Sequence, residues 1–472
     1  MLFNSIEFVL FFTLITLLYY SFNLSNRIWL LLIASCYFYL FFKPVYLLIL
    51  IGTIIVDYFA GILIEKSVGK QKLLYLILSL IANLGCLAFF KYFDFASENT
   101  ERILHLFGNT IQLPRMSNFF TNYMLPIGLS FHTFQAMSYT IEVYRGNQKA
   151  ERDFKVYALY VMFYPQLVAG PIERPQNVLP QFHRFHAYNF ENVKAGLLQM
   201  MWGFFKKAVI ADRLVIFVDE VYNQPEGFNG LTILMATFFF TFQIYCDFSG
   251  YSDIALGSAK VMGFDLMKNF DQPYTSRSIS EFWRRWHISL STWFRDYLYI
   301  PLGGNRVKFY RNCLNIFIVF TASGLWHGAK WTFVIWGSLH GIYLISALIR
   351  DKYLLKRASV EGQASKALDV IFTFCLVMLT WVFFRANTLH DALLILQRIS
   401  ELSFSEGLVS NLNLLEFVFC FILILILILK EHFVPVISSK NTVYFYWTFF
   451  GFAIINYLFG IYNQSQFIYF QF

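Results

Sequence analysis

Two histidines lie in apolar, tryptophan-rich sequence, where an ionisable side chain is unusual. His327 stands in "SGLWHGAKWTF", and His287 stands in "EFWRRWHISLSTW". Imidazole is the usual side chain for moving a proton near pH 7. A polar group buried in hydrocarbon without a partner costs several kcal/mol, so ionisable residues at membrane depth mark a site or pathway by default. His327 is therefore a candidate for proton transfer, and a hydrogen bond between neighbouring helices is the alternative.

The residues beside His327 indicate an open space. Gly324 and Gly328 have no side chains, and we expect them to leave the imidazole open to a group that approaches closely. Trp326 and Trp331 are expected to form the walls of that space. Lys330 has two interpretations: it reaches towards the membrane surface, or it balances negative charge that develops during a reaction.

The segment around His287 has the pattern of a helix with one aromatic face. A serine at 278 or 280 can cap its start, with Glu281 in the first turn. Apolar residues then recur at spacings of three and four, which define one face of a helix. They are Trp283, Trp286, Leu290, Trp293 and Tyr297. The pattern predicts one helix in the membrane interface, ended by "PLGGN", with His287 at the edge of its apolar face. A histidine there either belongs to a site or only packs.

Three arginines share the rest of this segment: Arg284, Arg285 and Arg295. They could bind the phosphates of a substrate. Alternatively they only follow the excess of positive charge that cytoplasmic membrane loops carry.

The remaining polar residues give weaker signals. His132 is interpreted as structural and His340 as an interfacial anchor. Asp247 and Asp253 in "YCDFSGYSD" are expected to cap a helix or pair with Lys or Arg, and an acid–base pair is the alternative. The six cysteines form no CxxC, and no HExxH, GxSxG or phosphate-loop motif occurs. We expect no metal and no tightly bound cofactor.

The whole composition indicates the elements that must position these residues. The chain has 472 residues, 57% hydrophobic and only 14% charged, with mean hydropathy +0.53. Soluble domains are about 45–50% apolar and about 25% charged. A multi-pass membrane protein surrounded by lipid is therefore expected. The net charge is +8, and the basic residues cluster between the apolar runs. This distribution indicates the orientation of a membrane protein better than it indicates nucleic-acid binding.

Apolar runs recur from Ile6 to Ile461, and several are short or broken by Gly, Pro or charge. They predict an all-α protein with about 11 membrane crossings plus re-entrant and interfacial helices. The basic segments Glu65–Lys72, Tyr144–Lys155 and Arg350–Lys366 should face the cytoplasm, which places the N-terminus outside. No repeat or long linker is evident, so we expect one membrane domain over residues 1–472.

The sequence resembles a known family. "EFWRRWHISLSTWFRDYLYIPLGGNR" and "GLWHGAKWTFVIWGSLHG" are similar to two signature blocks of the membrane-bound O-acyltransferases (the MBOAT family). "LPIGLSFHTFQAMSYTIEVYRG", "YPQLVAGPIERP" and "YCDFSGYSDIALG" are similar to its bacterial branch, the alginate O-acetyltransferase type. The opening "LFNSIEFVLFF" and the closing "FIYFQF" also match that branch.

The resemblance implies a ring-like bundle of helices around a central tunnel across the membrane. It implies that His327 and His287 are the functional histidines. It also implies transfer of an acyl group from a cytoplasmic donor to a hydroxyl on the far side of a bacterial inner membrane. We expect acetyl-CoA or an acyl carrier as donor, an exported polysaccharide of alginate or peptidoglycan type as final acceptor, and a periplasmic transferase as partner. His327 would act as general base or carry the acyl group covalently.

Other functions stay open on the sequence. Within the family, the acyl group could be D-alanine destined for teichoic acid, or the acceptor could be a secreted protein. Outside it, a transporter or flippase for lipid-linked glycans shares broken helices and buried polar groups.

Overall fold

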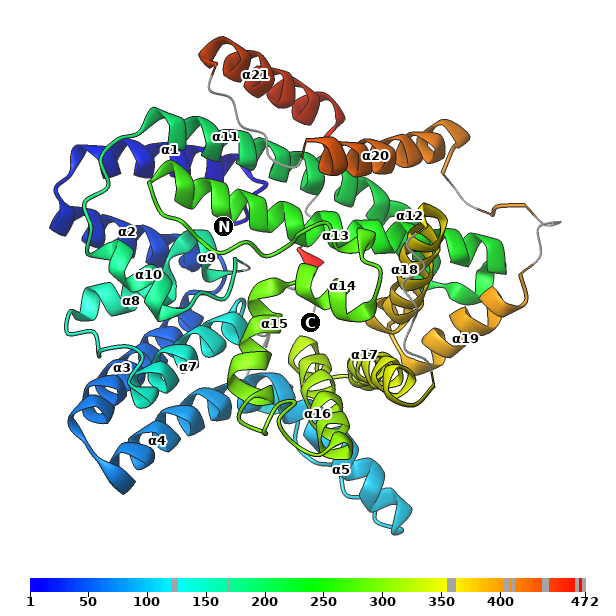
Figure 1. Ribbon diagram of the computed structural model, residues 1–472, viewed down its shortest axis with the longest axis horizontal. Helices are drawn as coiled ribbons and strands as arrows, with labels where there is room; N and C mark the ends of the chain where they lie inside the picture. The colour runs from blue at the N-terminus through cyan, green and yellow to red at the C-terminus, as the bar shows by residue number, and fades with distance from the viewer. Residues whose placement is uncertain are drawn as a thin grey trace. The chain divides into compact units, whose positions relative to one another are not determined.

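The computed structural model describes residues 1–119, 126–168, 170–354, 362–402, 407–409, 412–434, 441–462 and 467–468. In these ranges the regular structure is helical and no strand occurs, which confirms the all-α prediction (Figure 1). Of the closing block "FIYFQF", only Phe467 and Ile468 are among the described residues.

Within the described ranges, six helical stretches are long and apolar enough to cross a membrane. They are Pro44–Lys66, Gly69–Leu106, Gly230–Val261, Trp331–Tyr353, Gln363–Arg385 and Thr442–Phe459. Two shorter apolar helices, Ile6–Ser21 and Leu24–Leu40, precede them. A helix satisfies all its backbone groups internally, which is why apolar runs of about 20 residues adopt it in lipid. The chain is a multi-pass membrane protein, and the count of about 11 crossings is not confirmed.

The described chain forms two compact units. Unit 1 comprises Met1–Val193 with Ser258–Met267, and unit 2 comprises Lys194–Gly257 with Lys268–Phe472. The chain therefore passes from unit 1 to unit 2, returns for a ten-residue segment and leaves again. The prediction of a single domain stays a prediction.

Unit 1 holds the helices of the N-terminal part of the chain. They are α1 (Ile6–Ser21), α2 (Leu24–Leu40), α3 (Pro44–Lys66), α4 (Gly69–Leu87), α5 (Phe93–Leu106), α6 (Met116–Phe119), α7 (Leu129–Arg145), α8 (Phe154–Met162), α9 (Tyr164–Leu167) and α10 (Pro175–Phe182). Helix α7 lies at the centre, because all but four of its side chains are buried. Its neighbours include α3 and α4.

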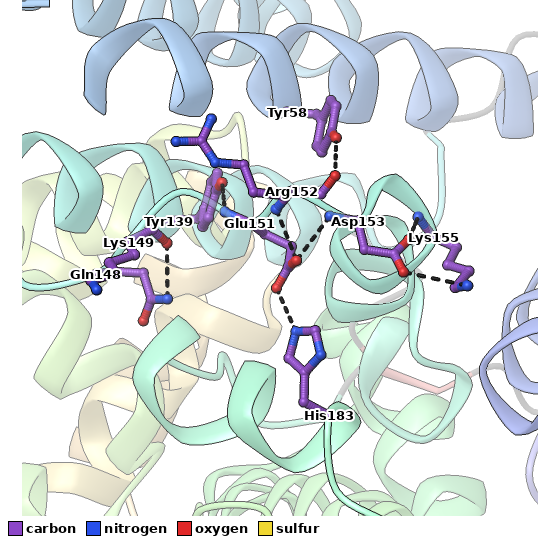
Figure 2. A network of polar contacts seen from close by, with 9 residues as sticks. All are labelled: Tyr58, Tyr139, Gln148, Lys149, Glu151, Arg152, Asp153, Lys155 and His183. Carbon is purple, nitrogen blue, oxygen red and sulfur yellow. Dashed lines mark hydrogen bonds and ion pairs between the residues drawn. The ribbon is translucent and has the colours of Figure 1, made fainter. Parts of the chain in front are cut away.

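The basic loop after α7 is fixed by polar contacts to Tyr58 on α3, to Tyr139 on α7 and to His183 just after α10 (Figure 2). The Glu151 carboxylate accepts backbone N–H bonds from Arg152 and Asp153 and lies 2.8 Å from His183 Nε2, just after α10. The Tyr58 hydroxyl on α3 donates to the Arg152 carbonyl at 2.5 Å. The loop is therefore a fixed part of unit 1, with its lysine and arginine side chains at the surface.

Unit 2 holds the second half. Its helices are α11 (Phe190–Phe204, from Lys194), α12 (Asp212–Asn223), α13 (Gly230–Val261, to Gly257), α14 (Ile279–Arg285), α15 (Ile288–Phe294), α16 (Phe309–His327), α17 (Trp331–Ile349), α18 (Gln363–Arg385), α19 (Leu389–Ser400), α20 (Leu414–Phe433) and α21 (Thr442–Phe459). Its core is rich in tryptophan, with the rings of Trp286, Trp336 and Trp381 almost fully enclosed.

Candidate active site

His287 lies at a break between two short helices. Ser278 caps α14 by accepting a hydrogen bond from the Glu281 backbone, as predicted. The helix ends at Arg285, and His287 has φ +44°, in the left-handed region, before α15 begins at Ile288. A continuous helix from 278 to 297 was therefore wrong. Spacing alone did not reveal the break, because the aromatic residues keep their helical period across it.

The His287 side chain is fully buried in unit 2. Its Nδ1 lies 3.1 Å from the Asn269 side-chain oxygen. The ring packs edge-on against Phe248 at 4.7 Å and near Trp326 at 6.2 Å between centroids. The left-handed backbone turns this imidazole into the core, although the predicted helix would have put it at an edge.

His327 is the last residue of α16 and is 3% exposed. Aromatic rings surround it: Trp326 and Trp336 at 5.0 Å and Phe384 at 5.5 Å between centroids. Its ring centroid lies 6.3 Å from that of His287. The fold therefore brings the ring of His287, between α14 and α15, close to the ring of His327 at the end of α16.

The glycines around His327 have a different role from the predicted one. A Cβ on Gly324 would lie 2.2 Å from the Phe333 carbonyl oxygen of α17, and a Cβ on Gly328 would lie 2.2 Å from the Phe333 ring. Gly337 on α17 meets α16 in the same way. What approaches closely is thus the neighbouring helix, and α16 and α17 pack backbone to backbone.

The walls of the His327 environment also differ from the prediction. Trp326 contacts the imidazole, but Trp331 is 48% exposed, and Trp336 from the next turn of α17 takes the expected place. Lys330 is exposed at the start of α17. Trp336 comes five residues after Trp331, one turn further along α17, and its ring reaches back to within 5.0 Å of the His327 ring between centroids.

A cavity of about 500 Å³ opens beside this pair in unit 2. Trp283, Phe294, Val319 and Phe320 supply apolar walls, and Ser323 lies one turn before His327. Neither histidine lines it. The cavity could not be predicted from the sequence, because its walls come from α14, α15 and α16. The break at His287 sets the angle at which α14 and α15 meet.

Two of the three candidate arginines line this cavity, namely Arg284 and Arg295. Arg285 does not belong to its lining; it pairs with Glu281 at 2.6 Å and donates to the Thr275 hydroxyl at 3.0 Å. Arg284 lines the cavity and Arg285 does not, because adjacent residues on a helix point in different directions.

The other two singled-out histidines are held by polar partners. His340 is buried, with Trp283 donating to its Nδ1 at 3.3 Å and the Thr380 hydroxyl 3.0 Å from its Nε2. It is a core residue of unit 2, so its interpretation as an interfacial anchor was wrong. His132 is buried in unit 1, 2.6 Å from the Thr53 hydroxyl, as expected for a structural histidine.

The two aspartates of "YCDFSGYSD" pair with lysines, as predicted. Lys207 lies 2.8 Å from Asp247 and 2.7 Å from Asp212, and Lys206 lies 2.6 Å from Asp253. Both lysines sit in a π-helical turn, Phe205–Ala211, between α11 and α12. The sequence signal was there: two adjacent lysines inside an apolar run need buried partners.

Glu173 in unit 1, within the block "YPQLVAGPIERP", is a further buried polar residue that sequence reasoning did not single out. Its carboxylate is buried and accepts hydrogen bonds from the Met267 backbone at 2.5 Å and the Asn177 amide at 2.7 Å. Burial raises the pKa of Glu173 to about 7, against the opposing effect of these hydrogen bonds. Glu173 therefore links the turn before α10 to Ser258–Met267, the later segment of the chain that also belongs to unit 1.

Among the described residues, no three His, Cys, Asp or Glu side chains cluster in a way that could hold a metal ion.

The structure is thus a helical membrane protein with two buried histidines beside an apolar cavity. Residues 147–386 match the model of the membrane-bound O-acyltransferase family, MBOAT. This range contains both His287 and His327. The chain belongs to this family and is a membrane-embedded O-acyltransferase.

The chain is similar to named bacterial members of this family. The chain is 40% identical to the "Probable alginate O-acetylase AlgI" of Pseudomonas aeruginosa, over 88% of this chain and 77% of that protein. It is 38% identical to the "Peptidoglycan O-acetyltransferase" of Helicobacter pylori, over 79% and 73%. It is 32% identical to the "Teichoic acid D-alanyltransferase" of Streptococcus thermophilus, over 55% and 68%.

Proposed function

We propose that this chain takes an acetyl group from acetyl-CoA on the cytoplasmic face of a bacterial inner membrane. The group passes across the membrane for O-acetylation of an exported cell-surface glycan of alginate or peptidoglycan type. The names of the two more similar relatives support acetyl transfer to a glycan. The relative named for D-alanyl transfer is less similar and aligns with a smaller part of the chain, which ranks that cargo second.

The observation that carries the proposal is the pairing of His287 and His327 at 6.3 Å between ring centroids, away from bulk water. His327 acts as general base: it removes the proton from the acceptor hydroxyl while that oxygen attacks the thioester carbonyl. The C–S bond then breaks, and the proton passes to the leaving thiolate of CoA. His287 orients the reacting groups. A covalent acyl group on His327 is the alternative route, in which the imidazole nitrogen attacks first.

The cavity supports a binding place for the donor. Its apolar walls suit the thin arm of a thioester donor, and Ser323 brings it to within one helical turn of His327. Arg284 and Arg295 supply positive charge for the phosphates of the donor. For the thioester to meet His327, the aromatic side chains around that ring must move aside.

The proposal also includes an orientation in the membrane and a partner for the final step. The N-terminus lies outside and the basic loop after α7 lies in the cytoplasm, on the side of the donor. A periplasmic transferase takes the acetyl group for the final step to the polysaccharide. Tests of transfer therefore need the periplasmic components.

The test uses inverted membrane vesicles, with the cytoplasmic face outward, that enclose periplasmic extract and alginate or peptidoglycan oligosaccharides. Acetyl-labelled acetyl-CoA is added outside. Vesicles containing the chain should accumulate label in the enclosed glycan and release CoA outside, and vesicles lacking it should not. A transporter would instead move glycan without consuming acetyl-CoA, and that result would refute the proposed function.

A further inference from the structure

The hydrogen bonds around His287 fix the position of its proton. The Asn269 side-chain oxygen lies 3.1 Å from His287 Nδ1. The same oxygen accepts from the Ser289 backbone N–H at 3.3 Å and from the Ser289 hydroxyl at 2.9 Å. Asn269, His287 and Ser289 are all at most 1% exposed, so this set of bonds is shielded from bulk water.

The orientation of the Asn269 amide is determined by its partners. A backbone N–H can only donate, so the amide atom that faces Ser289 must be the oxygen. The amide nitrogen then points the other way, where it lies 3.3 Å from the Ser252 hydroxyl on α13. Both ends of the amide therefore have a suitable partner, and a flipped amide would place two donors against each other.

This orientation decides which nitrogen of His287 carries the proton. A carbonyl oxygen has no proton to give, so Nδ1 must supply the hydrogen in the bond to Asn269. In the neutral ring, Nε2 then presents its lone pair. The left-handed backbone of His287, with φ +44°, holds the ring in this place at a conformational cost that non-glycine residues rarely bear.

We propose that Asn269 is a positioning residue that keeps His287 in the Nδ1–H form, so that Nε2 accepts a proton or a hydrogen bond from the reacting groups. The inference rests on the proposed acyl transfer. It assigns His287 the acceptor role, whereas an imidazole of the opposite tautomer would be a donor at Nε2. Asn269 itself touches neither donor nor acceptor substrate.

A purely structural role for Asn269 is the competing explanation. Its side chain satisfies the Ser289 N–H in the first turn of α15, and its backbone carbonyl accepts from the Ile288 N–H at 2.9 Å. Asparagine and aspartate are equally good at such a helix start. They differ in charge, and this difference separates the two roles.

The deciding experiment compares pH–rate profiles of acetyl transfer in wild-type and Asn269→Asp protein. A carboxylate at 269 still accepts from Nδ1–H and still caps α15, but its negative charge favours the protonated imidazole. Because protonated His287 cannot accept at Nε2, the acid limb of the profile should move to higher pH by about one unit or more. The titratable ring of His327 lies 6.3 Å from that of His287 between centroids. The wild-type and Asn269→Asp sequences are therefore also compared in the His327→Gln background, to separate the contribution of His327 to the profile.

Asn269→Leu supplies the second measurement. It removes the acceptor, so the imidazole is free to take the wrong tautomer, and kcat should fall roughly 10²-fold with little change in the KM for acetyl-CoA. Ser252→Ala leaves the bond to Nδ1 in place and should keep the wild-type pH profile. Size-exclusion elution in detergent checks that each variant is folded, and if the leucine variant is not, the aspartate variant decides alone.

An unshifted acid limb in folded Asn269→Asp protein overturns the inference and leaves Asn269 as a helix cap. Wild-type activity in His287→Ala protein overturns it as well. If wild-type protein itself transfers no acetyl group, the proposed function fails instead, so the two failures are distinguishable.

Discussion

At the residue scale, the sequence singled out the two candidate histidines, but it did not reveal the geometry around them. His287 and His327 stand out because imidazole is rare in apolar, tryptophan-rich segments, and the structure places their rings 6.3 Å apart. Asn269 and Ser289 gave no signal, because an amide and a hydroxyl are common in loops and helix starts. Their importance depends on where the chain places them around His287.

The two arginines of the cavity are predicted to contribute to donor binding. Arg284→Gln and Arg295→Gln should each raise the KM for acetyl-CoA by about tenfold at low salt, because each removes a charge-assisted bond to phosphate. The loss should shrink as salt rises, because screening weakens the wild-type interaction. Initial rates over a range of donor and salt concentrations measure it.

Arg311→Gln is the matched control. Arg311 is exposed on α16 and does not line the cavity, so its KM should stay at the wild-type value. An equal rise in all three variants would indicate a general effect of positive charge, and no rise in any would place donor binding elsewhere.

At the scale of elements, the sequence predicted where helices occur, but it did not predict where a helix is broken. Apolar runs such as Tyr46–Ile64 and Ala367–Phe384 lie within α3 and α18, because about 20 apolar residues favour a membrane helix. The break at His287 was missed because a left-handed residue there is neither Gly nor Asn, the residues that normally mark it. Tertiary contacts hold that turn instead of local propensity.

The close packing of α16 against α17 predicts a strong effect of one methyl group. Gly324→Ala should destabilise the protein by roughly 1–3 kcal/mol, because its Cβ would lie 2.2 Å from the Phe333 carbonyl oxygen and backbone cannot easily move. Transfer should fall as well, since His327 follows three residues later. Thermal unfolding in detergent and the rate of acetyl transfer measure the two effects.

Gly451→Ala on α21 is the control, because a Cβ there meets nothing within 4 Å. It should leave stability unchanged or raise it slightly. Equal unfolding temperatures for the two alanine variants would show that α16 and α17 are not held in backbone contact.

The turn before α10 predicts a pH dependence of stability. Glu173 has its ordinary pKa near 4.5 in the unfolded chain and about 7 in the folded protein, so the folded state binds the proton more tightly. Its contribution is therefore most favourable below pH 4.5 and is lost as pH rises through 7. Unfolding temperature should fall less between pH 5 and pH 8 in Glu173→Gln than in wild-type protein, and parallel curves would contradict this assignment.

At the scale of the whole molecule, composition alone identified a multi-pass membrane protein, and similarity identified the family. The number of crossings was harder, because runs such as Ala195–Val218 contain a π-helical turn with buried lysines that apolar character conceals. The division into two compact units left no mark in composition, since the boundary at Val193 and Lys194 falls inside α11.

The predicted topology gives a labelling pattern. Lys149 is exposed in the basic loop after α7, which we assign to the cytoplasm. Lys149→Cys, in a background with the six native cysteines replaced, should resist a membrane-impermeant maleimide in intact spheroplasts and react after lysis. Labelling in intact spheroplasts would invert the topology and place the donor on the wrong side.

The measurement that tests the account most directly is the rate of acetyl transfer, at saturating acetyl-CoA, in vesicles carrying His327→Ala protein. His390→Ala serves as control, because that histidine is exposed on α19, outside the ring cluster. Loss of a general base predicts a fall of roughly 10²–10⁴-fold in the His327 variant and none in the control, at equal protein levels. Transfer by His327→Ala at the wild-type rate would contradict the claim that this imidazole performs the reaction.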